Sequence, residues 1–130
     1  MPQIRISDAA RFLGVSDDTV RRWVSTDALK STEDTSGRMV IDGRELARFA
    51  LAQAKEMPDS GSSTSARNRF VGLVTAVKAD TVMAQVEMQC GPFRVVSLMS
   101  SEAVEELGLE PGSVAVAIVK STNVIIESLE

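Results

Sequence analysis

Residues 65–78, SARNRFVGLVTAVK, place a cluster of hydrogen-bonding side chains directly before a run of apolar and β-branched residues. A second run of the same kind, TVMAQVEMQC at 81–90, follows after only Ala79 and Asp80. Two such runs joined by so short a connection are typical of a β-hairpin. This hairpin decides the fold class of the C-terminal half.

Short elements of both kinds follow the hairpin. We predict a third strand at 92–100, a short helix at 101–109 that ends at Gly108, a turn at 110–113, and last strands at 114–120 and 123–128. Five short strands with one helix indicate a small β-barrel.

The N-terminal half has helical spacing instead. In ISDAARFLGV at 6–15, Ser7 is the expected N-cap of a first helix, and Gly14 can adopt the positive φ that ends it. The helix that follows, at 16–24, begins with Ser16 as its cap. The apolar positions of these two helices that are expected to face the core are Ala9, Ala10, Phe12, Leu13, Val20 and Trp23.

Two short helices joined by a tight turn have the layout of a helix-turn-helix, whose second helix would lie in the major groove of DNA. Arg21 and Arg22 are then the natural contacts, because either can donate to guanine or hold a phosphate. Thr19 is short enough to reach a base or a backbone oxygen. The alternative is an ordinary helical hairpin with a solvated arginine pair.

Beyond these helices the sequence predicts a polar turn at 32–37, a short strand at 38–41, and a helix from Gly43 to about Ala54 that Asp42 caps. A strand and a helix after the two first helices complete a small domain.

Over about residues 4–54 the chain resembles the winged helix-turn-helix of the MerR and excisionase type. The resemblance implies binding to double-stranded DNA, with Arg38 and Lys30 in a wing that touches phosphates. This half carries equal numbers of acidic and basic side chains, so its affinity is expected to depend on dimerisation and on a local basic face. The residues that carry the resemblance are Ala10, Leu13, Gly14, Val15, Ser16, Val20, Arg21 and Trp23. The candidate DNA contacts are Ser16, Thr19, Arg21, Arg22, Lys30 and Arg38.

Residues 57–64, MPDSGSST, contain a proline, a glycine and several hydroxyl side chains, with little to bury, and are typical of a linker. We therefore predict an α+β protein of two domains. A mainly α winged helix-turn-helix domain occupies 1–56, the linker 57–64, and a small OB-like β-barrel 65–130.

Composition excludes several classes of function. The 130 residues include no histidine and no tyrosine, which removes the commonest general base and metal ligand, so we expect neither an enzyme nor a protein-held metal ion. Cys90 is the only cysteine and is expected to be a half-buried strand residue in a reducing compartment. The absence of a long apolar run or a secretory signal favours a cytoplasmic protein that is not in a membrane.

Polar residues interrupt the apolar C-terminal half at two places, SARN at 65–68 and KSTN at 120–123. Arg67 and Lys120 supply fixed positive charge, and their neighbours supply hydroxyl, amide and backbone donors, a set that suits a small tetrahedral oxyanion. The alternative is that these are polar strand ends exposed to water.

Residues 65–128 resemble the molybdate-binding Mop, or TOBE, domain of the molybdopterin-binding protein family, through SARN and through Lys120-Ser121-Thr122-Asn123-Val124. The resemblance implies a small OB-like barrel that binds molybdate or tungstate between subunits, in a homodimer or a larger ring up to a hexamer. It implies the ligand residues Ser65, Ala66, Arg67, Asn68, Ser100, Lys120, Ser121 and Thr122.

The two resemblances together predict a one-component regulator of transcription that responds to molybdate. A molybdate or tungstate storage protein, in which the helical half serves assembly, is the alternative. A role in molybdenum cofactor supply rests on the family name alone.

Overall fold

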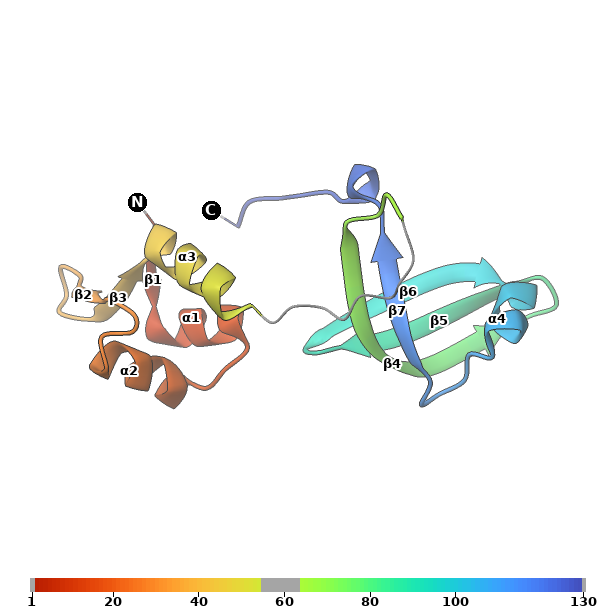
Figure 1. Cartoon of the computed structure of the whole chain (residues 1–130), viewed down its shortest axis with the longest axis horizontal. Coiled ribbons are helices and arrows are strands. Elements are labelled where there is room, and N and C mark those ends of the chain that lie inside the picture. The colour runs from red at the N-terminus through yellow and green to blue at the C-terminus, as the bar shows by residue number, and fades with distance from the viewer. Residues whose placement is uncertain (1, 55–63, 130) are drawn as a thin grey trace. The chain divides into compact units, whose positions relative to one another are not determined.

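The computed structural model describes residues 2–54 and 64–129. The chain divides into two compact units, Met1–Asp59 and Ser60–Glu130, each with its own hydrophobic core (Figure 1). The expected linker, apart from Thr64, lies outside the described residues. Within the described ranges, no helix is long and apolar enough to cross a membrane.

The N-terminal unit combines three helices with a small antiparallel sheet in the strand order β1-β3-β2. Strand β1 was not predicted; it pairs Gln3 with Asp42 and Ile4 with Ile41. The elements are β1 (Gln3–Arg5), α1 (Ile6–Leu13), α2 (Asp17–Ser25), β2 (Thr32–Glu33), β3 (Met39–Asp42) and α3 (Gly43–Gln53).

Helix α1 corrects two predictions. It begins directly after β1, with Arg5 at the N-cap position and no side-chain cap, so Ser7 lies inside the helix. Phe12 is 59% exposed rather than part of the core. At about 100° per residue, Phe12 lies roughly 110° from the centre of the buried face of α1, which is formed by Ile6, Ala9 and Ala10, so it points to solvent.

The predicted ends of the helices around the turn are confirmed. Gly14 has φ 69° and ends α1, and the Ser16 hydroxyl accepts a hydrogen bond from the N–H of Thr19 at 3.2 Å, as an N-cap does. Asp42 caps α3 by accepting from the N–H of Arg44 at 2.9 Å. The core below them holds Ile6, Ala9, Ala10, Val20, Leu29, Ile41 and Leu46, with Leu13, Trp23 and Phe49 packed against it.

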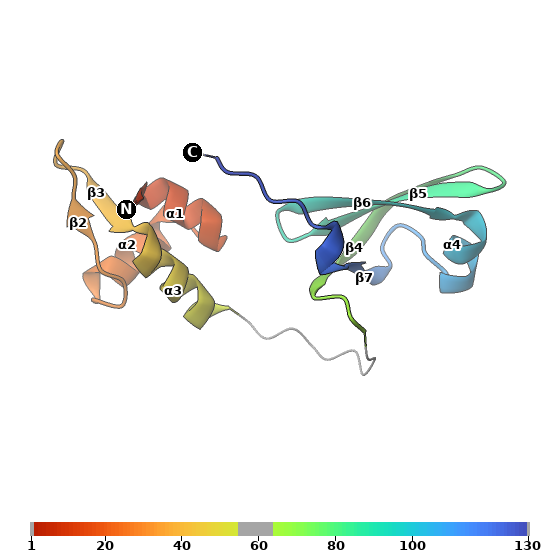
Figure 2. The same ribbon diagram turned by 90° about the horizontal axis from the view of Figure 1, so that it is seen from above.

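The C-terminal unit is a curled antiparallel sheet in the order β6-β5-β4-β7, with α4 at one end (Figures 1 and 2). The predicted helix after the third strand is confirmed, and Gly108 ends it at φ 64°. The elements are β4 (Asn68–Ala79), β5 (Met83–Cys90), β6 (Phe93–Ser100), α4 (Ser101–Leu107), β7 (Val114–Val119) and the 3₁₀ turn η1 (Ser121–Asn123). Together the two units confirm the α+β class.

The prediction of a strand at 123–128 is wrong for the single chain. After η1, residues 124–129 pair with no strand of the described chain, and Ile125 and Ile126 are 92% and 86% exposed. The curled sheet agrees with the expected OB-like fold, but it has four of the five expected strands, and its edges are β6 and β7. The β-branched residues Val124, Ile125 and Ile126 favour a strand, but strand formation also needs a partner with free backbone groups.

Gly72 in β4 lies close to the end of β5. A Cβ atom at this position would meet the carbonyl oxygen of Gln89 at 2.4 Å and the sulfur of Cys90 at 2.7 Å. Backbone approach, not a positive φ, therefore requires glycine here.

We expect Gly72→Ala to destabilise the C-terminal unit by about 1–3 kcal/mol, because the methyl group forces β4 and β5 apart. The control Gly43→Ala meets its nearest atom at 3.3 Å and should change stability by less than about 0.5 kcal/mol. Urea denaturation read by far-UV circular dichroism measures the effect. Trp23 fluorescence, which reports on the N-terminal unit, should keep its midpoint; an unchanged far-UV midpoint for Gly72→Ala would contradict the close approach.

Candidate functional site

Helix α2 presents the candidate DNA contacts of the N-terminal unit. Arg21 and Arg22 are exposed, and within the described residues neither takes part in an ion pair. The Ser16 and Thr19 hydroxyls hydrogen-bond each other at 2.9 Å while Ser16 also caps the helix. The two arginines are therefore freer than the two hydroxyls to bind an outside partner.

The wing is the hairpin of β2 and β3. Lys30 precedes β2 and Arg38 precedes β3, and both side chains are exposed. The turn between the strands is held by the Asp34 carboxylate, whose pKa is lowered mainly by a hydrogen bond from the Ser36 hydroxyl and then by one from the Arg38 N–H. The wing thus adds two cationic side chains to those of α2.

In the C-terminal unit, the pairing of β4 with β7 brings the two polar segments together. Asn68 at the start of β4 lies opposite Val119 at the end of β7, and its side-chain amide donates to the Val119 carbonyl at 3.0 Å. Figure 1 shows these two strand ends side by side. One chain therefore holds SARN and KSTN at the same end of its sheet.

Each residue of this polar end has a distinct environment. The Arg67 guanidinium is exposed and donates to the Thr64 carbonyl at 3.1 Å, and Ala66, which is buried, donates its N–H to the Thr64 hydroxyl at 3.2 Å. Ser65 is exposed as well. Thr64 was not predicted to belong to this polar end, because the composition of residues 57–64 placed it in the linker. A threonine hydroxyl that accepts from the N–H two residues later is a known local turn, and this spacing could have indicated it.

On the β7 side, Lys120 and the η1 residues Ser121 and Thr122 are exposed. The structure records no ion pair for Lys120 within the described ranges. Arg67 and Lys120 thus bring two cationic side chains to the end of the sheet at which Ser65, Ser121 and Thr122 are also exposed.

Ser100 lies elsewhere in the chain. It pairs with Met83 at the opposite end of the sheet and caps α4 by accepting from the N–H of Ala103 at 3.1 Å. A single chain therefore does not bring Ser100 to the other predicted ligand residues. The sequence alone does not reveal that Ser100 lies far from SARN and KSTN, because this separation follows from how the strands pair.

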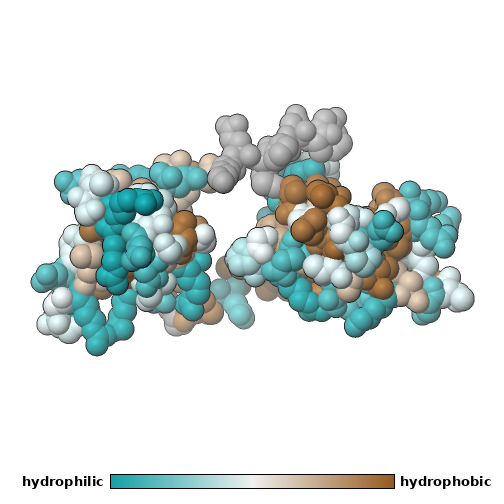
Figure 3. Space-filling view, turned by 90° about the horizontal axis from the view of Figure 1, so that it is seen from below, coloured by the Kyte–Doolittle hydropathy of each residue, from teal (hydrophilic) through white to brown (hydrophobic). Residues whose placement is uncertain are grey.

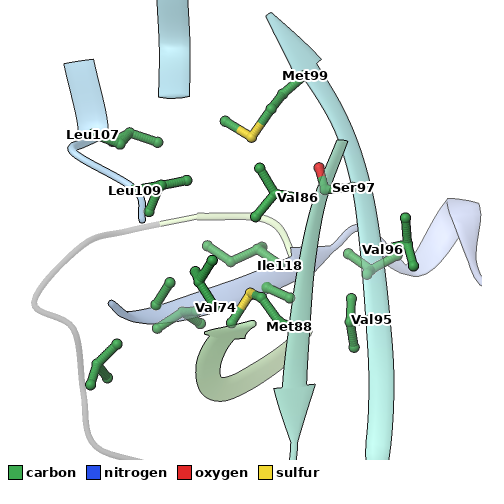
Figure 4. Close-up of a pocket in the computed structure, with 15 residues that line it drawn as sticks. Val74, Val86, Met88, Val95, Val96, Ser97, Met99, Leu107, Leu109 and Ile118 are labelled. Carbon is green, nitrogen blue, oxygen red and sulfur yellow. The ribbon is translucent and has the colours of Figure 1, made fainter. Parts of the chain in front are cut away.

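The concave face of the sheet holds a hollow of about 520 Å³. Figure 4 shows apolar side chains of β5, β6 and β7, together with Leu107 and Leu109, around this space. Ser97 provides the only polar side chain in its lining, so an oxyanion placed there would lack partners. No group of three or more His, Cys, Asp or Glu that could hold a metal ion occurs among the described residues.

Comparison with known proteins agrees with both units. Residues 4–54 match a helix-turn-helix domain and residues 64–126 a TOBE domain. Molybdenum-pterin-binding protein 3 of Clostridium pasteurianum is 42% identical over 65 residues, which are 49% of this chain and 96% of that protein. Molybdenum transport protein ModE of Herbaspirillum seropedicae is 38% identical over 64 residues, which are 48% of this chain and 24% of that protein.

A solved structure of a molybdate binding protein from Sporomusa ovata aligns with 52% of this chain and all of its own, at 28% identity and a TM-score of 0.50. These relatives are named as binding and transport proteins rather than as enzymes, in agreement with the expectation of a non-catalytic chain. Through residues 64–126 the chain belongs to the TOBE-domain family of molybdenum-pterin-binding proteins, with a helix-turn-helix domain joined in front.

Proposed function

We propose that this chain is a transcriptional regulator that binds double-stranded DNA through residues 1–56 and molybdate, or the similar tungstate, through residues 65–130. The observation that carries the proposal is the presence of a helix-turn-helix domain and a TOBE domain in one chain. The similarity to ModE and to molybdenum-pterin-binding protein 3 supports the second half.

The oxyanion site we propose is the polar end of the sheet. Its charges come from Arg67 and Lys120 and its neutral donors from Ser65, Ser121 and the backbone; Asn68 and Thr64 hold the two segments in place. Charge-assisted hydrogen bonds from such groups favour a small dianion over a neutral ligand. Ser100, at the far end of the sheet, would join this site only from a second copy of the chain.

We expect Arg67→Ala and Lys120→Ala each to weaken molybdate binding by roughly ten- to a hundredfold, because each removes a charged hydrogen bond worth about 1.5–3 kcal/mol. Lys30→Ala removes the same charge from the N-terminal unit and should leave the affinity for molybdate unchanged. Calorimetric titration of the anion-stripped protein with molybdate, and with sulfate for comparison, measures this. Affinity that is insensitive to both Arg67 and Lys120 would exclude this site.

A homo-oligomer is the second part of the proposal, and its basis is the unfinished sheet. Val124, Ile125, Ile126 and Leu129 expose apolar side chains and belong to no strand of the described chain. The hollow between β6 and β7 is apolar, and both of these edges are free of a further strand in the described chain. Figure 3 shows apolar surface gathered on the C-terminal unit. We propose that residues 124–129 of a second copy fill the hollow and add a strand to the open edge.

We expect Ile126→Asp to shift the chain toward the monomer, because a buried carboxylate without a partner is costly. Glu127→Gln changes the charge of the neighbouring residue, which is exposed, and should leave the assembly intact. Sedimentation velocity of the full chain gives the mass in each case. A mass unaffected by Ile126→Asp would show that another surface makes the oligomer.

DNA binding would use α2 in the major groove, with the wing on the adjacent backbone. We expect Arg21→Ala and Arg22→Ala each to weaken binding to duplexes that the full chain selects from a random-sequence library. Removing an arginine that binds a phosphate lowers the slope of log affinity against log salt by about one, whereas removing one that binds a base relaxes the preferred sequence at one position. Arg48→Ala, whose arginine pairs with Glu45 on α3, is the matched control.

These selections, run with and without molybdate, also test regulation. Ligand changes DNA affinity only if it binds two arrangements of the assembly with different affinity. A chain that binds molybdate but selects no duplex from the library would support the storage alternative, which has one observation in its favour. The matched region makes up 96% of molybdenum-pterin-binding protein 3, so a protein named for this binding needs little beyond the TOBE domain.

A further inference from the structure

The turn at the tip of the wing is held by one carboxylate, and we propose that Asp34 is a positioning residue that presents Arg38 to a DNA phosphate. This inference rests on the DNA binding proposed above and adds a role for a residue that does not itself touch DNA. Figure 2 shows the β2–β3 turn projecting from the N-terminal unit.

A single oxygen of Asp34 accepts three hydrogen bonds inside the turn. They come from the N–H of Ser36 at 2.9 Å, the hydroxyl of Ser36 at 2.7 Å and the N–H of Arg38 at 3.0 Å. The backbone of Asp34 makes two more hydrogen bonds. Its N–H donates to the Arg38 carbonyl at 2.9 Å, and its carbonyl accepts from the N–H of Gly37 at 3.0 Å. Residue 34 therefore organises the whole turn.

Arg38 is fixed at its backbone, whereas its charged side chain is not held in a salt bridge of the described chain. Both its N–H and its carbonyl are bound to Asp34, so the direction in which its side chain leaves the chain is set. The guanidinium is exposed and enters no ion pair within the part of the chain that the structure describes. An arginine held in this way loses less conformational freedom when it binds a phosphate than one on a loose loop.

The charge of Asp34 allows a sharp test. An acidic side chain close to a phosphate-binding arginine weakens DNA binding by repulsion, so its removal should strengthen binding if charge is all that matters. Loss of the turn has the opposite effect. The same substitution thus changes affinity in opposite directions under the two explanations.

The experiment measures the affinity of the full chain at several salt concentrations for the selected duplex and for a mixed-sequence duplex. Arg38→Ala should lower the salt slope by about one on both duplexes, because a phosphate contact carries no sequence information. Asp34→Ala should lower the slope by nearly as much. Because Asp34 is proposed to act through Arg38, the double variant Asp34→Ala with Arg38→Ala should have a slope close to that of either single variant. Asp34→Asn keeps an acceptor oxygen without the charge and should restore the slope of the unmodified chain.

Asp27→Asn removes a negative charge from the same unit outside the wing turn and serves as the control for charge alone. Trp23 fluorescence during denaturation confirms that the variants fold. An Asp34→Ala protein that binds as tightly as Asp34→Asn, with the salt slope of the unmodified chain, would overturn the positioning role.

The two proposals fail in different ways. Binding that depends on Arg21 and Arg22 but is unaffected by Arg38→Ala and Asp34→Ala overturns the role of the wing alone. If the unmodified chain binds neither duplex, the proposed function is wrong, and this inference is wrong with it.

Discussion

The pairing of β4 with β7 is the constraint on which the rest of the C-terminal unit depends. The paired residues run from Asn68 opposite Val119 to Leu73 opposite Val114, so the ladder joins segments that lie far apart in sequence. At its polar end the Asn68 amide donates a hydrogen bond to Val119, which is 51 residues away in sequence. This ladder brings two polar segments to one end of the sheet. It also makes β7 an edge strand, which leaves the concave face open. The candidate ligand site and the apolar hollow are two results of the same pairing.

An open apolar face and an exposed run of apolar side chains, as at 124–126, are both costly for an isolated chain. Exposed edges are ready templates for another strand, and proteins usually cover, twist or charge them. Here β7 is short and almost wholly apolar, and the segment after η1 carries side chains of the same kind. The chain therefore has an apolar surface to be covered and an apolar segment that could cover one, and the oligomer that we propose would satisfy both. The open sheet thus favours an oligomer independently of the family to which the chain belongs.

Local chemistry made much of the fold predictable. Gly14, Ser16, Asp42 and Gly108 act through hydrogen bonds or φ angles within a few residues, and each ends or begins its helix as predicted. Two wrong predictions, Ser7 as a cap and Phe12 as a core residue, lie within α1, whereas the missed strand pairings depend on partners distant in sequence. Strand β1 pairs with β3, which follows it in sequence only after two helices. The segment 123–128 has no strand partner in the described chain. The separation of Ser100 from SARN likewise follows from strand register, which residue spacing does not reveal.

Each unit also has a complete and separate hydrophobic core. An oxyanion bound at the end of the β4–β7 ladder is therefore not linked to α2 through a shared core. The coupling that we propose would therefore act through the arrangement of whole units rather than through a common core. Such coupling is reciprocal: a ligand that favours the DNA-binding arrangement by some factor is itself bound more tightly by that factor when DNA is present. In this chain, assembly through the unfinished sheet is what would connect the sensor to its output.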